Sequence, residues 1–171
     1  MDRILLLGQS AGAHVALMML LAPEELLTAD CAYPAFRHNF LGCITINAPA
    51  ILYPDKETGR QLWTNPPNLD PLFGGISCYD DDTEYRRYSP MTYVSADMKP
   101  VFLGVGASDQ AVNPKQSYLF QEAAEKAGGD CTMFVLQHAG HGFEAVDGEI
   151  TPPTSEFYKE AYEFIHKLIA G

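Results

Sequence analysis

A serine lies between two glycines near the start of the sequence, in the stretch Gly-Gln-Ser-Ala-Gly at positions 8–12. The apolar run 4–7 before it predicts a buried strand, and the helix-forming run 11–21 after it predicts a helix. Strand, Gly-x-Ser-x-Gly and helix in this order are typical of a nucleophile elbow, a sharp turn that exposes a serine hydroxyl. We therefore predict that Ser10 is a nucleophile that attacks a carbonyl carbon.

The residues around Ser10 fit such a turn. Gly8 and Gly12 lie two positions before and after the serine, where a sharply bent backbone needs small side chains. Ser10 is also at the N-terminus of the expected helix, where backbone N–H groups favour developing negative charge. Backbone N–H groups at this position can therefore stabilise an oxyanion that forms beside the serine.

A serine nucleophile needs a histidine base and a carboxylate that orients the histidine. In this arrangement each residue follows a strand, in the order Ser, acid, His. Asp109 follows the apolar run 101–105 and precedes an expected helix, so it is the predicted acid. The alternative for Asp109 is an aspartate that caps the helix or closes a turn. Asp97 and Asp130 lie before strands, at the wrong end of the sheet.

His141 is the predicted base. It lies in Ala-Gly-His-Gly-Phe, directly after the apolar run 132–136, and its flanking glycines allow the loop to approach the serine closely. His138, three residues earlier, is the alternative base. His14 lies one turn into the helix after the serine, and we expect it to be a packed histidine bonded to a loop or a neighbouring element.

Strands and helices alternate along the chain. We expect strands at 4–7, 42–47, 101–105 and 132–136, and helices at 11–21, 114–127 and 154–170. Strands that are apolar throughout and joined by helices indicate a parallel sheet covered on both faces. The predicted fold is therefore a single, partial α/β domain over 1–171, with a mostly parallel sheet of about four strands and helices on both faces. A long proline-rich segment at about 49–90 is expected to be a lid-like insertion.

The segment 49–90 contains four aromatic residues and a run of three aspartates. We expect the aromatics to form a local core rather than to line a substrate pocket; they are Tyr53, Trp63, Phe73 and Tyr79. The run 80–82 could bind Ca²⁺, but adjacent carboxylates are more typical of a solvated loop. No metal and no cofactor is predicted.

Composition restricts the partners of the chain. Its 171 residues include 11 Lys and Arg against 22 Asp and Glu, a net charge of −11. Such an acidic chain is not expected to bind nucleic acid or an anionic membrane. No apolar run reaches the roughly 18–20 residues of a membrane span. The sequence enters the strand 4–7 directly, without a signal peptide, which would indicate the cytoplasm, although the N-terminus reads as truncated.

The cysteines show no metal-binding or redox spacing. They are Cys31, Cys43, Cys78 and Cys131. We expect free and mostly buried thiols. A Cys31–Cys43 disulfide would require that the chain is exported.

Together these residues resemble the α/β-hydrolase superfamily and, within it, the esterase/lipase branch of hormone-sensitive-lipase-like, carbohydrate-ester and feruloyl-esterase-like enzymes. The resembling segments follow the family's order along nearly the whole chain, at 2–4, 8–14, 88–94, 109–112, 116–117 and 140–143. The resemblance implies that Ser10 is the nucleophile, Asp109 the acid and His141 the base, with the Ala11 N–H as one oxyanion donor.

The sequence departs from this family in three ways. Val105-Gly106 stands where the family usually has His-Gly, and His138 where it often has Gly. Similar enzymes also carry an N-terminal part before the elbow, with the first strands and a His-Gly-Gly-type loop that supplies further oxyanion donors. The sequence thus resembles only the C-terminal portion. We expect the strand 4–7 to be a bare sheet edge that would pair with a missing N-terminal half or with a second copy.

The predicted function is a serine carboxylic-ester hydrolase that acts through an acyl-enzyme on small acyl or carbohydrate esters. One alternative is a serine peptidase of the prolyl-oligopeptidase type, which shares the elbow and the order of the catalytic triad. The other is a catalytically impaired fragment or an interaction module that keeps the triad residues by descent.

Overall fold

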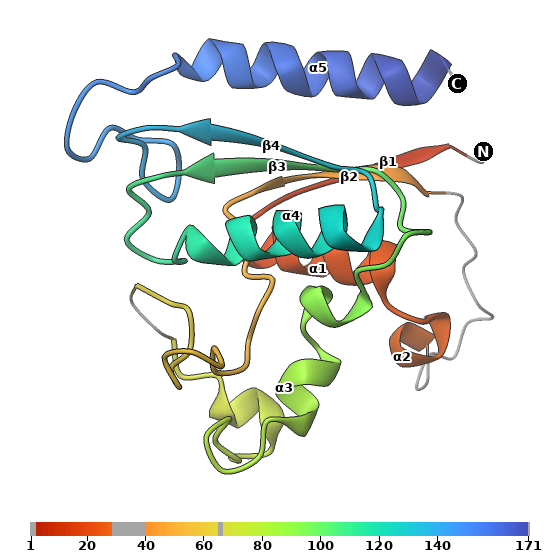
Figure 1. Cartoon of the computed structure of the whole chain (residues 1–171), viewed down its shortest axis with the longest axis vertical. Helices are drawn as coiled ribbons and strands as arrows, with labels where there is room; N and C mark the ends of the chain where they lie inside the picture. The colour runs from red at the N-terminus through yellow and green to blue at the C-terminus, as the bar shows by residue number, and fades with distance from the viewer. Residues whose placement is uncertain (1–2, 29–39, 65–66, 171) are drawn as a thin grey trace.

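The computed structural model of the chain describes residues 3–28, 40–64 and 67–170. Its centre is a sheet of four parallel strands in the order β1-β2-β3-β4 (Figure 1). The strands are β1 (Ile4–Gln9), β2 (Phe40–Ile46), β3 (Val101–Gly106) and β4 (Cys131–Leu136). The predicted α/β fold with a parallel, four-stranded sheet is confirmed.

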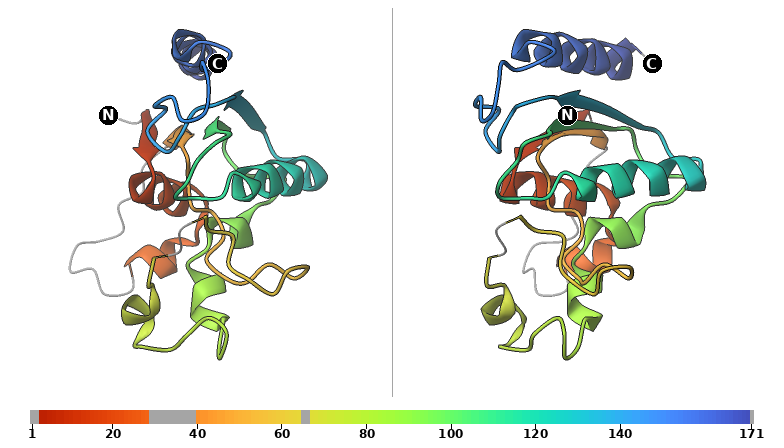
Figure 2. Two further views of the ribbon diagram at one scale, coloured as in Figure 1. Left: turned by 90° about the vertical axis from the view of Figure 1, so that its left-hand side faces the viewer. Right: turned by 60° about the vertical axis from the view of Figure 1, so that its left-hand side comes forward.

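Helices cover both faces of the sheet, as is usual for a parallel sheet with apolar residues on both faces. Figure 1 shows α1 (Ala11–Leu21) and α4 (Lys115–Ala127) on one face and α5 (Thr154–Ala170) on the other, and the turned views of Figure 2 keep this separation. The short helix α2 (Glu24–Thr28) follows α1.

Two hydrophobic cores lie on the two faces because neighbouring residues of a strand point to opposite sides. Cys43 and Leu103 pack with α1 and α4, in a core that includes Leu17 and Phe120. On the other face, Ile44 and Phe102 pack with residues that include Phe157 of α5.

The strands end at one common edge of the sheet. Gln9 is paired with Ile46, Ile46 with Gly104, and Gly104 with Phe134, so the carboxyl ends of the strands are nearly level. The loops that follow β1, β3 and β4 therefore meet at this edge, and they contain the three predicted catalytic residues.

The segment 49–93 forms a separate layer beyond α1 and α4 (Figure 1). It contains α3 (Thr83–Arg87) and two short 3₁₀ turns, η1 (Asp70–Phe73) and η2 (Pro90–Tyr93). A small core of Leu52, Cys78 and Tyr85 holds it together, and the Phe73 ring lies 4.0 Å from that of Tyr85.

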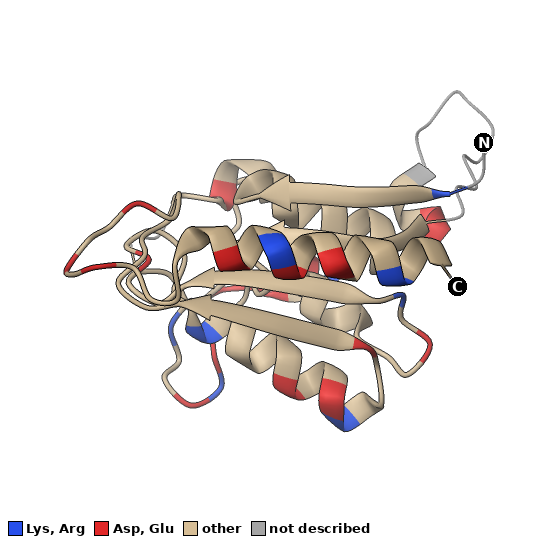
Figure 3. Cartoon of the chain, turned by 90° about the horizontal axis from the view of Figure 1, so that it is seen from above, with Lys and Arg blue, Asp and Glu red and all other residues tan. Residues whose placement is uncertain are grey.

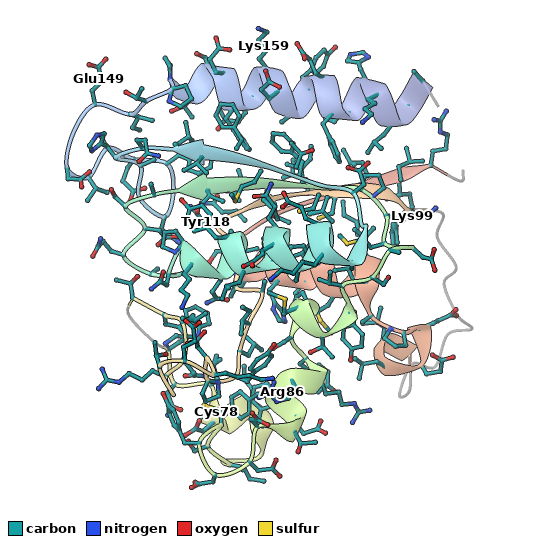
Figure 4. The ribbon with its side chains drawn as sticks, in the orientation of Figure 1. Cys78, Arg86, Lys99, Tyr118, Glu149 and Lys159 are labelled. Carbon is teal, nitrogen blue, oxygen red and sulfur yellow. The ribbon has the colours of Figure 1, made fainter. Side chains whose placement is uncertain are left out.

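The local-core interpretation is confirmed for three of the four aromatics. The three that pack against the small core are Tyr53, Trp63 and Phe73. The interpretation is wrong for Tyr79, which is 61% exposed. Arg86, labelled in Figure 4, stacks 4.0 Å from the Tyr53 ring and pairs with Asp82. The lid role of the segment stays a prediction.

Three of the cysteines are free thiols. Cys43 and Cys78 are buried and Cys131 is half-buried. Burial raises the pKa of the Cys43 and Cys131 thiols to about 12, so both are protonated at neutral pH. Cys31 lies outside the described residues.

The strand β1 forms an edge of the sheet. Among the described residues it pairs only with β2, and Leu7 at this edge is 69% exposed. On α1 beside it, Val15 is 54% exposed. Figure 3 shows acidic and basic residues mainly on the helices and loops, with a basic residue at the start of the edge strand. The residues of β1 itself include no charged side chain, so the edge is mainly apolar along the strand. None of the described helices is long and apolar enough to cross a membrane.

We predict that Thr45→Val stabilises the protein. The Thr45 hydroxyl is buried in β2 and has no hydrogen-bond partner among the described residues. Replacing it with a methyl group of the same shape removes the desolvation cost, and the free energy of unfolding should rise by about 1 kcal/mol in urea titrations. The control is Thr132→Val, the same change at an exposed position of β4, with an expected effect within about 0.5 kcal/mol. A Thr45→Val protein less stable than the wild type would contradict the assignment.

Candidate active site

Ser10 occupies a sharp turn between β1 and α1. Its backbone has φ 53° and ψ −125°, in the positive-φ region that side-chain-bearing residues rarely adopt. The Ser10 N–H donates to the Ile46 carbonyl at 2.9 Å, which fixes the turn to β2. The serine carbonyl accepts from the N–H groups of Ala13 and His14 in the first turn of α1. The turn thus has the strained backbone of a nucleophile elbow.

The two motif glycines differ in their surroundings. A Cβ on Gly8 would collide with the Gly12 carbonyl and lie 2.6 Å from the Ala13 nitrogen, so strand and helix can approach only with glycine at position 8. A Cβ on Gly12 would meet no atom of the described residues within 4 Å. The described residues therefore give a steric reason for glycine at position 8 but none at position 12.

Hydrogen bonds connect Ser10, His141 and Asp109. The Ser10 Oγ lies 2.7 Å from His141 Nε2, and His141 Nδ1 lies 2.8 Å from Asp109 Oδ2. A carboxylate next to Nδ1 assigns the ring proton to that nitrogen and leaves Nε2 as the acceptor for the serine proton. Ser10 and His141 are 131 positions apart in the sequence. With Asp109 they nevertheless form one continuous chain of hydrogen bonds, called the relay below.

Asp109 is placed for both of the roles considered for it. Its Oδ1 accepts from the N–H groups of Ala111 at 2.7 Å and Val112 at 3.1 Å, which closes the turn after β3. Its Oδ2 faces His141. Asp109 is only 3% exposed, so these hydrogen bonds replace the water that a carboxylate otherwise needs.

The alternative base, His138, has a different partner. Its Nδ1 lies 2.9 Å from Asp147 Oδ1, and the same oxygen accepts from the Ser108 hydroxyl at 3.1 Å. These contacts hold the pKa of the Asp147 carboxyl below its usual range, mainly through the hydrogen bond from His138. The structure thus brings His141, rather than His138, to Ser10.

The predicted oxyanion donor lies beside the serine. Ala11 is the first residue of α1, and its N–H has no acceptor among the described residues. The first N–H groups of a helix lack partners within the helix, so they can donate hydrogen bonds to an anion. Ala11 also contributes to the wall of the pocket that contains Ser10.

That pocket has a volume of about 470 Å³ and is mainly apolar. Besides Ser10, Ala11 and His141, its walls come from α1, from the loop after β3 and from the segment 49–93; these residues are His14, Val15, Pro49, Leu52, Trp63, Pro67, Leu69, Leu72, Ala111 and Val112. Trp63 forms an isolated antiparallel bridge with Val112. Trp63 therefore belongs both to the local core and to the pocket wall, which the sequence prediction treated as alternatives.

The run of aspartates at 80–82 is used within the loop. Asp81 Oδ1 accepts from the Thr83 N–H at 2.9 Å, and Asp82 pairs with Arg86 at 2.6 Å. Across residues 3–28, 40–64 and 67–170, no three His, Cys, Asp or Glu side chains are grouped as a metal site would require.

His14 is the packed histidine that the sequence predicts. Its Nδ1 lies 2.9 Å from the Pro49 carbonyl oxygen, which assigns the ring proton to Nδ1. Burial disfavours the cation and lowers the pKa of His14 below its usual range. His14 thus presents a neutral ring to the pocket.

Comparisons with known proteins relate this chain to a family and to several solved structures. The BD-FAE family model matches residues 1–124. Among solved structures, esterase 2 of Thermogutta terrifontis phosphoramylated by tabun is 24% identical, with a TM-score of 0.69 over 96% of this chain and 55% of that one. The propionate-bound form of the esterase is 25% identical, with a TM-score of 0.66 over 96% and 56%.

The apo form of that esterase has a TM-score of 0.68 at 24% identity, again over 96% and 55% of the two chains. The chain therefore spans a little more than half the length of these solved structures. No similar sequence was found among curated proteins.

We predict that His14 makes the stability of the protein depend on pH. The unfolded chain binds a proton at His14 below pH of about 6.5, whereas the folded chain resists this proton because its pKa is lower. Stability is therefore lost as the pH falls from about 6.5 toward the folded pKa, by at most about 1.4 kcal/mol per pH unit.

The variant His14→Asn keeps an N–H donor for the Pro49 carbonyl but does not titrate. Urea unfolding of wild type and variant between pH 5 and 8 should give curves that diverge at acidic pH, with the wild type losing more stability. Parallel curves over this range would show that His14 does not carry the effect.

Proposed function

This chain belongs to the BD-FAE family, and on that premise we propose that it is a serine carboxylic-ester hydrolase. The observation that carries the proposal is the relay in which Ser10 Oγ lies 2.7 Å from His141 Nε2 while His141 Nδ1 lies 2.8 Å from the buried Asp109. These distances are within hydrogen-bond reach, as proton transfer from a nucleophile to its base requires.

In the acylation step, Ser10 Oγ attacks the ester carbonyl carbon and gives its proton to His141 Nε2. Asp109 stabilises the imidazolium and holds its orientation. The Ala11 N–H stabilises the oxyanion. The tetrahedral intermediate then collapses, His141 returns the proton to the leaving oxygen, and the alcohol departs from an acyl-enzyme.

In the deacylation step, His141 takes a proton from water, and the resulting hydroxide attacks the acyl carbonyl. A second tetrahedral intermediate collapses, Ser10 regains its proton, and a carboxylic acid is released. The net reaction consumes one ester and one water and gives one acid and one alcohol.

Esters of short acyl groups are the proposed substrates. The pocket beside Ser10 is mainly apolar and has a volume of about 470 Å³, enough for a small acyl chain and a part of the alcohol. Solved structures of Thermogutta terrifontis esterase 2 include a propionate-bound and a butyrate-bound form. The apolar wall and these relatives support a preference for uncharged acyl chains.

The described residues provide one candidate oxyanion donor, the Ala11 N–H. A single donor is worth roughly 10²–10³-fold in rate, so turnover with one donor is expected to be slow. Covalent labelling of the serine is therefore a more sensitive test than turnover, because one event per molecule is enough.

We predict that a fluorophosphonate labels Ser10. Wild-type protein should gain one phosphonyl group by intact mass, Ser10→Ala should gain none, and His141→Ala should react at least about 10²-fold more slowly. His138→Ala is the matched control and should react at the wild-type rate because His138 bonds to Asp147. Equal labelling of Ser10→Ala and wild type would refute the assignment of Ser10 as the nucleophile. Slow labelling of His138→Ala with normal labelling of His141→Ala would show that His138 is the base.

We also predict that Asp109→Asn slows both labelling and p-nitrophenyl acetate hydrolysis by about 10⁴-fold. The amide keeps an oxygen for the Ala111 and Val112 N–H groups, but its NH₂ group would face His141 Nδ1 and favour the wrong tautomer of the ring. The control, Asp147→Asn, makes the same change beside His138 and should stay within about twofold. A comparable loss in both variants would indicate a general loss of folding instead.

A further inference from the structure

The loop that carries His141 needs an attachment that fixes it against the two other loops of the site. Neither a helix nor a strand begins near His141, so the ring is placed only by loop contacts. The His141 carbonyl accepts two side-chain hydrogen bonds, from Asn47 Nδ2 at 2.7 Å and from Gln9 Nε2 at 3.2 Å. Asn47 is the buried partner of these two, at 3% exposure, whereas Gln9 is exposed.

Asn47 directly follows β2, the strand between the strand of the nucleophile and the strand of the acid (Figure 1). Its backbone N–H donates to the Gly104 carbonyl of β3 at 2.9 Å. The residue before it, Ile46, accepts the Ser10 N–H at 2.9 Å. The backbone at 46–47 is therefore bonded both to the nucleophile turn and to the acid strand.

The Asn47 side chain connects this backbone to the third loop of the site, which carries His141. Its Oδ1 accepts from the Gly106 N–H at 2.8 Å, three positions before Asp109. Its Nδ2 donates to His141 and also to the Gly140 carbonyl at 3.3 Å. The amide thus uses its acceptor on the acid strand and both donor hydrogens on the histidine loop, which assigns oxygen and nitrogen without ambiguity.

The local backbone also favours asparagine. Asn47 has φ 50°, a left-handed conformation that asparagine adopts more readily than most residues with a side chain. Aspartate offers no donor to the two carbonyls when ionised, and serine is too short to reach both loops. From the sequence, Asn47 is predicted only as the last residue of the strand 42–47.

From these contacts we propose that Asn47 is a positioning residue that sets the distance of His141 from Ser10 and Asp109. The proposal rests on the proposed function, since it assigns Asn47 to the same reaction. Asn47 touches neither substrate nor reacting atoms, so it acts through the histidine loop. Its loss displaces the ring and weakens the bond between His141 and Asp109, while the substrate pocket, to which Asn47 does not contribute, is unchanged.

The main test variant is Asn47→Gly. Glycine accepts φ 50° without strain, so this change removes the amide and its hydrogen bonds but keeps the backbone. Asn47→Asp is a second variant of the same shape, which keeps the acceptor for Gly106 and presents an oxygen to the two carbonyls. Thr45→Val is the matched control, because Thr45 is buried two positions earlier, in β2, and its hydroxyl has no hydrogen-bond partner among the described residues.

The first readout does not require activity. Long-range ¹H–¹⁵N spectra of histidine-labelled protein show which ring nitrogen of His141 carries the proton, with His141→Gln for the assignment. We expect the Nδ1–H form in the wild type and in Thr45→Val, and a mixture of tautomers in both Asn47 variants. A wild-type tautomer in Asn47→Gly would overturn the proposal, whether or not the protein hydrolyses esters.

The second readout is kinetic. In both Asn47 variants the labelling rate with fluorophosphonate and the kcat for p-nitrophenyl acetate should fall about 10²-fold per folded molecule, while KM stays within about twofold. A purely structural role would lower the fraction of folded protein and leave the rate per folded molecule unchanged, and that result would overturn the proposal. Failure of both variants to fold would make Asn47 a determinant of the fold, which likewise overturns it.

The two proposals can fail separately. A wild type that is neither labelled nor active would refute the ester hydrolase, whereas the tautomer spectra would still decide the role of Asn47. A labelled wild type with unchanged Asn47 variants would refute only the positioning residue.

Discussion

Level carboxyl ends of four parallel strands are the constraint on which the site depends. A parallel pair cannot be closed by a tight hairpin, so each connection crosses back over a face of the sheet. The crossover helices α1 and α4 lie on one face, α5, which follows the last strand β4, covers the other, and the loops that follow the strands meet at one edge (Figure 1). Because Gly104 is in register with both Ile46 and Phe134, the turns after β1, β3 and β4 begin at nearly the same height. Residues far apart in sequence come within hydrogen-bond distance for this reason.

At that edge, a buried carboxylate orients the histidine of the proposed site. Asp109 is almost completely withdrawn from water, and such a charge is costly unless every oxygen is bonded. Two backbone N–H groups bond one oxygen and His141 bonds the other. The same arrangement that stabilises the turn therefore also fixes the tautomer of His141, so the fold and the proposed catalysis depend on one set of bonds. His138 and Asp147 form a similar pair nearby, but they are exposed and do not contact the serine.

The layer formed by 49–93 gives the site its apolar wall. Its small core around Tyr85 holds the outer part of the layer together. Ile51 and Leu62 of the same segment belong to the core of the sheet, which attaches the layer to α1 and α4. Trp63 extends from this layer to Val112 in the loop of the acid. The neutral His14 lies in the same wall, bonded to the first residues of the layer through Pro49. The pocket is thus shared between the sheet and the segment 49–93, which is also bonded to the loop of Asp109 through the Thr64 hydroxyl and the Asp109 carbonyl at 3.2 Å.

The sequence by itself determined the elements, their order and the residue types of the relay. Apolar runs and helix formers are local signals, and they gave β3 and α5 nearly to the residue. The glycines around Ser10 and His141 likewise identified tight turns, because the backbone conformation of a turn depends mainly on its own residues. The choice of Asp109 followed from its place after a strand.

Only the tertiary structure decided which groups meet. His138 and His141 are three positions apart in one loop, and their roles separate because one faces Ser10 and the other Asp147. Trp63 contributes to the pocket, Tyr79 is exposed, and Asn47 has partners both at the end of β3 and in the loop of His141. These outcomes depend on strand register and on contacts between residues distant in sequence, which no local pattern encodes. Local patterns thus specify the parts of this site, while the register of the sheet specifies how they are assembled.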